Sequence, residues 1–378
     1  MSMKKQFLVT RNRAKIFICG PTVYDYCHLG HARIFLFYDL MARYLISKDV
    51  LPIILVNITD IDPKISFRAK NEGVSEYDIS NKFTNELFID LLSLGIDTTL
   101  SFAKVSDYVN IAKHLVIKLL ENKLAYSANG NVYLDTTNLA SFGRLSRMTK
   151  RDLYNSRFDI APDKRNPYDI LLWNSTDIFE SRHNDKILGN GIPWWHMQDS
   201  SIAMSNFNGR YDIHGGAIEL IYPHHESHLA QLQVLTHKQQ PIKYWTHVGL
   251  VNINGKKMSN STNNALRIRD LLKKYNSNII RLYIFSTHYR KSLNFSESEI
   301  DKFESIDEII ANAMIANINV IYDNKKPKTK SNSWNRFIEY IEDDFDTPRA
   351  LEIMCKVAKS KQSIDDLKNM VNIFGLKY

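Results

Sequence analysis

Two histidines lie close together near the start of the chain, in the string His28-Leu29-Gly30-His31. The preceding apolar run, Lys15 to Cys19, stops at Gly20-Pro21, which predicts a buried strand that ends in a tight loop. The apolar residues after His31 recur at helical spacing, so a helix is expected to begin at this string. A helix N-terminus offers unpaired N–H groups, and imidazoles add donors, so the position predicts a phosphate-binding site. The other interpretation is that these histidines only satisfy the polar groups of a loop.

A second string, Gly255-Lys256-Lys257-Met258-Ser259-Asn260-Ser261, combines glycine, lysines and hydroxyl groups much further along the chain. Lys257 could neutralise negative charge that develops on a phosphate during its transfer. Taken alone, such a string is also typical of a charged loop exposed to solvent. Its meaning therefore depends on the other strings of the chain.

Donor atoms that suit a metal ion occur at scattered positions, on Cys19, Asp199, His224 and His228. His224 and His228 are four residues apart, so on a helix they would share one face and could bind one ion. Zinc accepts sulfur, nitrogen and oxygen donors of this kind. The alternative is that Asp199 and His228 are ordinary polar residues and that no ion binds.

The composition sets limits on the class of protein. The chain has 378 residues, of which 44% are hydrophobic, so it can bury a sizeable core in two or three domains, and overall disorder is excluded. Lys and Arg number 49 and Asp and Glu 41, and the net charge of +8 permits an anionic partner such as a nucleic acid. Only three cysteines occur, which excludes a disulfide-rich secreted scaffold and favours the cytoplasm. No apolar run reaches the roughly 18 residues of a membrane span.

The apolar pattern also predicts the elements that must position these side chains. A second buried strand is expected over Pro52–Ile58, so strand, helix and strand form a βαβ unit with a parallel sheet. The apolar runs Ile218 to Tyr222 and His247 to Asn252 predict further strands and connections. After about Glu297 the pattern turns helical. The fold class is therefore α/β.

The two strings, in this order, resemble the HIGH and KMSKS signatures of class I aminoacyl-tRNA synthetases. Further strings narrow the resemblance to cysteinyl-tRNA synthetases, and it runs from about Lys15 to Lys361. These strings are Cys19-Gly20-Pro21-Thr22-Val23-Tyr24-Asp25, Asn57-Ile58-Thr59-Asp60-Ile61-Asp62, Lys164-Arg165-Asn166-Pro167, Trp195-His196, Asp212-Ile213-His214-Gly215-Gly216 and Pro223-His224-His225-Glu226.

The resemblance implies a Rossmann-like catalytic domain with a parallel sheet, an inserted connective domain and a C-terminal helical domain. Residues 1–95 and 190–250 would form the two halves of the catalytic domain, and residues 96–189 the connective insertion. Residues 251–310 would form a stem-contact region with the Lys-Met-Ser-Asn-Ser loop, and residues 311–378 the helical domain.

The resemblance also implies a reaction in two steps. The carboxylate of cysteine attacks the α-phosphate of ATP, supplied with Mg²⁺, and the acyl group then moves to the terminal ribose of tRNA(Cys). His28 and His31 would bind the phosphates, and Lys257 the pyrophosphate. The other expected nucleotide-binding residues are Gly20, Thr22, Gly30, His214, Gly215 and Gly216.

Two residues would bind the amino acid. Trp195 would pack on the cysteine side chain, and Thr59 would hold the amino-acid part. Without the resemblance, Trp195 would be taken as a core aromatic residue and Thr59 as a hydroxyl at the end of a strand. Asn260 stands where the family has a second lysine, so weaker stabilisation of the transition state is expected.

One zinc ion per chain is implied by the resemblance, because family members hold zinc with two Cys, one His and one Glu. Here Cys19 and His224 match, Asp199 stands at the second Cys position, and His228 at the Glu position. This set has a ligand charge of −2 instead of −3, which would leave the ion a stronger Lewis acid. Zinc would distinguish cysteine from serine, because zinc favours a thiolate, whereas a pocket of matching shape discriminates such small differences weakly.

Members of the family usually continue into a small domain that reads the anticodon, whereas this chain stops at Tyr378. The expectation is therefore a short, monomeric, cytoplasmic synthetase without that domain. The basic segment Lys325 to Lys330 could touch tRNA phosphates or could be a solvated loop. Mycothiol-pathway cysteine ligases, which share the catalytic core and transfer cysteine to an amino sugar, are one alternative. A non-catalytic tRNA- or nucleotide-binding relative is another, and the retained histidines and Lys257 argue against it.

Overall fold

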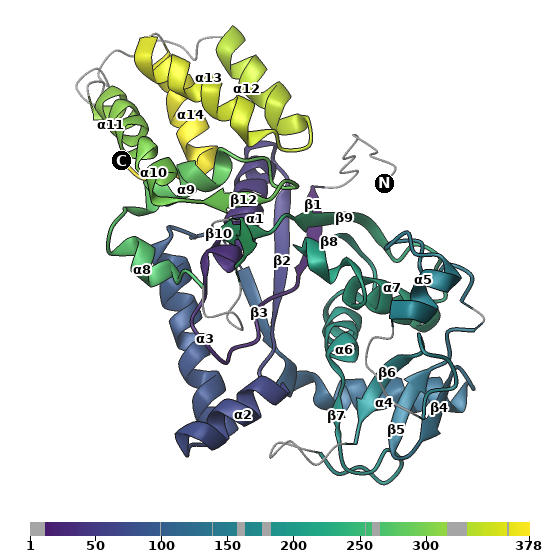
Figure 1. Cartoon of the computed structure of the whole chain (residues 1–378). Helices are drawn as coiled ribbons and strands as arrows, with labels where there is room; N and C mark the ends of the chain where they lie inside the picture. Colours follow the sequence, from purple (N-terminus) through teal and green to yellow (C-terminus); the bar gives the residue numbers. More distant parts are fainter. Residues whose placement is uncertain are drawn as a thin grey trace.

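A five-stranded sheet forms the centre of the computed structural model, which describes residues 12–98, 100–137, 139–156, 163–175, 183–253, 255–258, 265–315, 331–360 and 363–378 (Figure 1). All neighbouring strands are parallel, in the order β3-β2-β1-β8-β9. The strands are β1 (Arg13–Ile18), β2 (Leu51–Ile58), β3 (Leu100–Lys104), β8 (Tyr211–Ala217) and β9 (Ile242–Val248). The sheet confirms the predicted α/β class with parallel strands.

The strand order reverses at β1, which pairs with β2 on one side and with β8 on the other. The chain first builds β2 and β3 and only later returns to add β8 and β9 on the opposite side. In open parallel sheets, ligands bind beyond the carboxyl ends of the strands at such a reversal. Cys19 and Gly20 follow β1 directly, so they lie at this point of the sheet.

The helix α1 (Leu29–Ser47) connects β1 to β2, as the apolar pattern predicts. Its buried Arg33 donates hydrogen bonds to the carbonyl oxygens of Gly249 at 3.0 Å, Leu250 at 2.9 Å and Lys291 at 2.6 Å. One guanidinium thus holds together segments that are distant in sequence. This contact fixes the chain that leads into the second signature string beside α1.

Two helices, α2 (Pro63–Glu72) and α3 (Glu76–Ser93), follow β2. Asp62 caps α2, because its carboxylate accepts a hydrogen bond from the backbone N–H of Lys64 at 2.8 Å. Proline at the first helical position suits this start, since it lacks an N–H that would be left unpaired. The Asp-Ile-Asp-Pro sequence after β2 therefore ends the strand and begins a helix.

A second sheet is inserted between β3 and β8 and lies below the helices α6 and α7 in Figure 1. It is antiparallel, in the order β4-β5-β6-β7. The described elements between β3 and β8 are η1 (Val105–Tyr108), α4 (Val109–Glu121), β4 (Ala125–Ala128), β5 (Asn131–Leu134), α5 (Lys150–Ser156), β6 (Ile170–Asn174), β7 (Ile192–Pro193) and α6 (Trp195–Phe207). After β8, η2 (Ile218–Ile221) and α7 (His224–Thr236) lead to β9.

The C-terminal part contains a small three-stranded sheet and a group of helices, drawn in green and yellow in Figure 1. Within the described residues its elements are β10 (Val251–Ile253), β11 (Lys256–Lys257), α8 (Ile268–Leu272), α9 (Ser277–Phe285), β12 (Leu293–Phe295), α10 (Glu297–Ile300), α11 (Lys302–Ile315), α12 (Asn332–Glu342), α13 (Thr347–Ser360) and α14 (Ile364–Phe374). The basic segment Lys325 to Lys330 and Asn260 lie outside the described residues.

A buried ion pair attaches these helices to the central sheet. The guanidinium of Arg281 on α9 pairs with Asp39 on α1, and neither side chain is exposed to solvent. Arg281 also donates to the carbonyl oxygens of Phe374 at 2.9 Å and Leu94 at 3.0 Å. One cation therefore joins α9, α14 and the end of α3 to α1.

Two elements refine the sequence-based expectation. The run Ile218 to Tyr222, expected among further strands and connections, forms the short 3₁₀ helix η2. It is the connection from β8 to α7, and a short apolar run by itself does not distinguish a buried strand from such a turn. β3 lies within residues 96–189, the range assigned to the insertion, yet it pairs with β2 in the central sheet. Among the described residues, no helix has the length and apolar character needed to cross a membrane.

Candidate active site and metal centre

A cavity of about 940 Å³ opens at the carboxyl edge of the central sheet, where the strand order reverses. Both signature strings contribute to its wall. The predicted site residues on this wall are Cys19, Gly20, Thr22, His28, Gly30, His31, Thr59, Trp195, Asp199, His224 and Lys257. Tertiary folding thus brings most of the candidate residues to one cavity.

His28 and His31 begin the helix α1 and cap each other. The Nδ1 atom of His28 accepts from the backbone N–H groups of Gly30 at 3.1 Å and His31 at 3.4 Å. The backbone N–H of His28 in turn donates to Nδ1 of His31 at 3.3 Å. Because a backbone N–H can only donate, both Nδ1 atoms are acceptors, and each neutral ring carries its proton on Nε2. The stacked rings, 3.9 Å between centroids, therefore have Nε2–H groups to offer to phosphate oxygens.

Burial lowers the pKa of His28, and it lowers the pKa of His31 further, with an added effect of His28. Both rings are therefore neutral at physiological pH. They can donate hydrogen bonds to a phosphate, but they do not supply a formal positive charge. That charge has to come from another side chain on the cavity wall.

Lys257 is such a side chain, and it lines the cavity from β11. Its ammonium group forms an ion pair with the carboxylate of Glu219 on η2, and both side chains are about half exposed. Met258, the next residue, is buried, and its Cε atom lies 3.4 Å from the position that a Cβ at Gly30 would occupy. The second signature string thus packs directly against the first.

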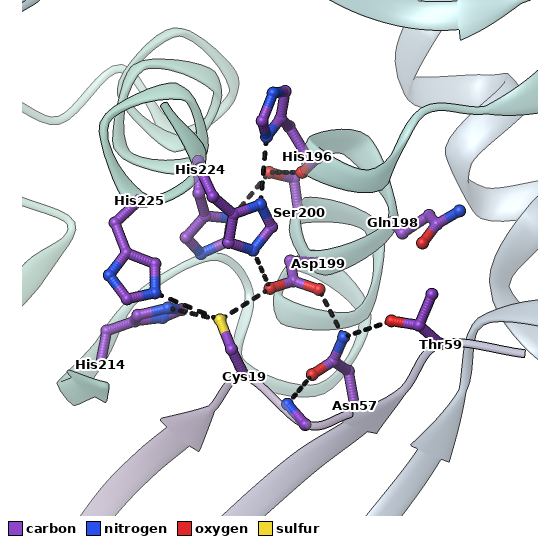
Figure 2. A network of polar contacts seen from close by, with 12 residues as sticks. Cys19, Asn57, Thr59, His196, Gln198, Asp199, Ser200, His214, His224 and His225 are labelled. Carbon is purple, nitrogen blue, oxygen red and sulfur yellow. Dashed lines mark hydrogen bonds and ion pairs between the residues drawn. The ribbon is translucent and has the colours of Figure 1, made fainter. Parts of the chain in front are cut away.

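The sulfur of Cys19 is the centre of a buried polar cluster (Figure 2). Its Sγ atom lies 3.1 Å from Oδ2 of Asp199, and 3.3 Å from Nε2 of both His214 and His225. Nε2 of His224 lies 2.9 Å from the same Oδ2. Donor atoms of Cys19, His224 and His225, and those of Cys19, Asp199 and His214, approach one another within 4.8 Å.

These separations suit a zinc ion. Zinc bonds of about 2.0–2.3 Å in tetrahedral geometry place neighbouring ligand atoms roughly 3.3–3.8 Å apart, close to the separations around Cys19. Burial, and then Asp199, raise the pKa of Cys19 well above its usual value, so the thiol is protonated in the absence of a cation. Burial alone would raise the pKa of Asp199 as well, but His224 and its other partners lower it. A cation could thus replace the thiol proton beside an ionised carboxylate.

Cys19, Asp199 and His224 also line the cavity, whereas His214 and His225 are not part of its wall. The first three can therefore contact a bound ion and a substrate at the same time. His214 and His225 approach the sulfur of Cys19 and are held in turn by Tyr211, at 2.7 Å from Nδ1 of His214, and by His247, at 2.8 Å from Nδ1 of His225.

Trp195 lies beside the cluster. Its ring stacks on the imidazole of His224, with 4.4 Å between centroids and 13° between planes. Nδ1 of His224 is 3.0 Å from Nδ1 of His196, which orients the ring so that Nε2 faces Asp199. Since Trp195 is on the cavity wall and only partly buried, its position favours contact with a ligand over a role in the core.

His228, expected among the metal ligands, does not join the cluster. It lies on α7 with His224, but its Nδ1 is 2.9 Å from Oγ of Ser200 and its Nε2 is 2.7 Å from the hydroxyl of Tyr211. Both ring nitrogens therefore have partners, and His228 is not part of the cavity wall. The spacing in sequence was right for one helix face, but the neighbouring side chains turn this ring elsewhere.

His214, Gly215 and Gly216, expected to bind the nucleotide, are also not on the cavity wall. A Cβ on Gly215 would overlap the hydroxyl of Tyr38, so this glycine is needed for the packing of α1 on β8. A Cβ on Gly216 would lie 3.3 Å from Cβ of Cys19. These residues of β8 therefore pack next to Cys19 on the side away from the cavity.

Asn57, Glu219 and His225 contact the site, although they were not among the predicted site residues. Asn57 lies in β2, where its amide nitrogen donates to Oδ1 of Asp199 at 2.8 Å. Asn57 could have been found because it is a polar residue in a predicted buried strand that ends at the site. His225 could have been found because it lies in the family string Pro223-His224-His225-Glu226. No local pattern pointed to Glu219.

The comparisons with known proteins agree with this geometry. A family model described as the tRNA synthetases class I (C) catalytic domain matches residues 6–305. A cysteine–tRNA ligase from Methanococcus aeolicus is 33% identical over 370 residues, which cover 94% of this chain and 76% of that protein. The chain belongs to the cysteinyl-tRNA synthetase family. Another member, from Thermococcus gammatolerans, is 31% identical over 96% of this chain and 82% of its own length.

Solved structures support the family fold. The methionyl-tRNA synthetase of Mycobacterium tuberculosis in complex with methionyl-adenylate superposes with a TM-score of 0.68 at 12% sequence identity. The match covers 96% of this chain and 88% of that one. A putative arginyl-tRNA synthetase from Campylobacter jejuni gives a TM-score of 0.57, also at 12% identity. At such identities the likeness concerns the fold alone.

Proposed function

We propose that this protein activates cysteine with ATP and transfers the cysteinyl group to tRNA(Cys). The observation that carries the proposal is that one cavity holds two kinds of site. His28, His31 and Lys257 lie on its wall and would bind phosphates, and Cys19, Asp199 and His224 lie on the same wall and would form a thiol-selective metal centre. The similar proteins named cysteine–tRNA ligase support the same reaction.

In the first step, an oxygen of the cysteine carboxylate attacks the α-phosphorus of MgATP. The bond between the α-phosphorus and the bridging oxygen breaks, and pyrophosphate leaves. The neutral Nε2–H groups of His28 and His31 are proposed to hold the phosphate oxygens in line, and Lys257 to offset the charge on the leaving pyrophosphate. Phosphoryl chemistry of this kind depends on positioning and charge stabilisation, and it needs no protein nucleophile.

In the second step, a ribose hydroxyl of the tRNA attacks the acyl carbon, and AMP leaves. The chain's excess of basic residues suits a polyanionic partner. A monomer that acts in the cytoplasm is part of the same proposal.

Zinc is proposed to bind at Cys19, Asp199 and His224. When bound, zinc supplies affinity for a thiolate, which a serine hydroxyl does not match. Cys19 and Asp199 would provide the two negative charges, and His224 a neutral nitrogen. Trp195, stacked on His224, would limit the space beside the sulfur, and Thr59 would hold the amino-acid part.

The test is a charging assay with zinc-loaded protein, ATP, labelled cysteine and total tRNA, in which acid-precipitable cysteine is counted. We expect charging with cysteine and none with serine, together with cysteine-dependent exchange of pyrophosphate into ATP. Exchange of pyrophosphate without charging of tRNA would indicate that the acceptor is an amine, and an assay with an amino sugar in place of tRNA tests this. Absence of both exchange and charging would overturn the proposal.

A further inference from the structure

Asp199 has two donor oxygens, whereas the thiolate that the family resemblance implies at this position has a single donor atom. Oδ2 faces the cluster, 3.1 Å from Sγ of Cys19 and 2.9 Å from Nε2 of His224. Oδ1 faces the other way and accepts a hydrogen bond from Nδ2 of Asn57 at 2.8 Å. The two oxygens of one carboxylate therefore have different environments (Figure 2).

The orientation of the Asn57 amide follows from its neighbours. Oδ1 of Asn57 accepts the backbone N–H of Gly20 at 2.5 Å, and a backbone N–H can only donate. The amide nitrogen must then face Asp199, and it also lies 3.3 Å from Oγ1 of Thr59. A Cβ on Gly20 would overlap the carbonyl oxygen of Asn57, so a glycine is required for this close approach of the two strand ends.

We infer that Asn57 is a positioning residue that restricts Asp199 to binding the metal through one oxygen. The inference rests on the proposed function, because it concerns the proposed zinc site. A carboxylate can bind a metal through one oxygen or through both. With both oxygens bound, Cys19, His224 and Asp199 would fill the four positions of a tetrahedral zinc ion. With Oδ1 held by Asn57, Asp199 takes one position, as a thiolate would. Because His214 and His225 are not part of the cavity wall, the remaining position faces the cavity and stays open for the sulfur of cysteine.

Burial strengthens this restriction. Asn57 is 3% exposed and Asp199 1% exposed although both border the cavity, so Oδ1 has little contact with solvent that could replace the amide as a donor. Rotation of the carboxylate toward the metal would leave the Asn57 amide without this partner in a buried environment, which is unfavourable. The amide is itself held at its other end by Gly20. The position of one oxygen is thus set by the end of β1 and by β2.

The test compares Asn57→Ala with the unchanged protein, both loaded with zinc and without substrate, by X-ray absorption at the zinc edge. We expect one additional oxygen or nitrogen neighbour in Asn57→Ala, because Oδ1 becomes free to bind. Addition of cysteine should add a second sulfur neighbour in the unchanged protein and little or none in the variant. Identical spectra for the two proteins, before and after cysteine, would overturn the inference.

A double-mutant cycle distinguishes this positioning role from a general structural role, because it compares the effect of Asn57→Ala on the KM for cysteine in two backgrounds. Asn57→Ala should raise the KM for cysteine by roughly tenfold or more, the lower end of the effects of residues that orient metal ligands. In Asp199→Cys, which offers a single sulfur at this position, the same change should raise it by much less. An equal rise in both backgrounds would contradict the inference. Asn57→Ser, which keeps an oxygen but shortens the side chain, replaces Asn57→Ala if the latter does not fold.

Thr59→Val is the matched control, because it removes the other partner of the Asn57 amide and leaves Asp199 untouched. It should leave the zinc coordination number unchanged. A failure of the proposed function gives a different result: the unchanged protein would then bind no zinc, or would gain no sulfur neighbour when cysteine is added.

Discussion

Asp39 and Asp199 are both buried carboxylates in the core of this protein, with 0% and 1% of their surface exposed, but their partners differ in charge. Asp39 pairs with the guanidinium of Arg281, accepts from Nε of Arg43 at 3.0 Å, and accepts from the hydroxyl of Thr98 at 2.9 Å. The partners of Asp199 are a thiol, an imidazole and an amide, on Cys19, His224 and Asn57.

The difference separates a structural carboxylate from one that suits a ligand. Asp39 already has two guanidinium groups at hydrogen-bond distance, so its charge is balanced without a metal ion, and it stabilises the packing of α1 against α9. Two partners of Asp199, the thiol of Cys19 and the imidazole of His224, can bind a metal ion in place of their hydrogen bonds to the carboxylate. A buried carboxylate therefore points to a metal site when the groups around it are metal ligands and not guanidinium ions.

The largest effect is expected from Asp39→Ala, which leaves Arg281 buried without its counter-ion. Removal of one partner of a buried ion pair lowers the free energy of unfolding by about 3–5 kcal/mol. Urea unfolding of the whole chain measures it. Glu299→Ala, which breaks the exposed pair of Glu299 with Lys302, should lower it by less than about 1 kcal/mol. A similarly small loss for Asp39→Ala would contradict the structural role assigned to the Asp39–Arg281 pair.

Zinc should stabilise the protein through Asp199 and not through Asp39. A ligand present at 100 times its Kd raises the free energy of unfolding by about 2.7 kcal/mol. The unchanged protein and Asp39→Ala should both gain this stability when zinc is added after treatment with a chelator. Asp199→Ala should gain little, and thermal unfolding with and without zinc shows the difference. An equal gain in Asp199→Ala would place the zinc elsewhere.

Glu219 is a third kind of carboxylate, exposed and paired with Lys257 on the cavity wall. Because ATP phosphates would compete with this carboxylate for the ammonium group, Glu219→Gln should lower the KM for ATP. An exposed pair contributes about 0.2–1 kcal/mol, so the decrease is at most about fivefold. The measurement is pyrophosphate exchange at varied ATP concentration.

The matched control for Glu219 is Glu297→Gln, which removes the carboxylate of an exposed pair with Lys274 at 2.6 Å, away from the cavity. It should leave the KM for ATP unchanged. A higher KM for ATP in Glu219→Gln would mean that Glu219 contacts the nucleotide itself, contrary to the expected competition.

The last prediction concerns pH and the histidine pair at the start of α1. Burial lowers the pKa of His31 in the folded state, so below its ordinary pKa of about 6.5 the unfolded chain binds the extra proton. Stability therefore decreases as the pH falls through this value. At about pH 5.5 the contribution of one such histidine is at most about 1.4 kcal/mol. Urea unfolding of the unchanged protein and of His31→Gln at about pH 7.5 and 5.5 measures it, and equal pH dependence in both would show that His31 titrates normally.

The amino-acid sequence by itself determined the order of the first elements and the identity of the two signature strings. Apolar runs and helical spacing are local, so β1, α1 and β2 were predicted close to their observed bounds. The strings lie where a strand ends or a helix begins, and parallel strands have their carboxyl ends at one edge. This pattern places Cys19 and His28 near one edge of the sheet, whereas the resemblance to the family assigned Thr59 and Asp199 to the same site.

Only the tertiary structure decided which side chains meet within that site. His224 and His228 have the same spacing from one another on any helix, but Ser200 and Tyr211 hold His228 away from Cys19. The contact of Asn57 with Asp199 joins residues 142 positions apart, and the Glu219–Lys257 pair joins residues 38 apart. Such contacts depend on how elements pack and on which rotamer the packing permits, and neither is encoded in a local pattern.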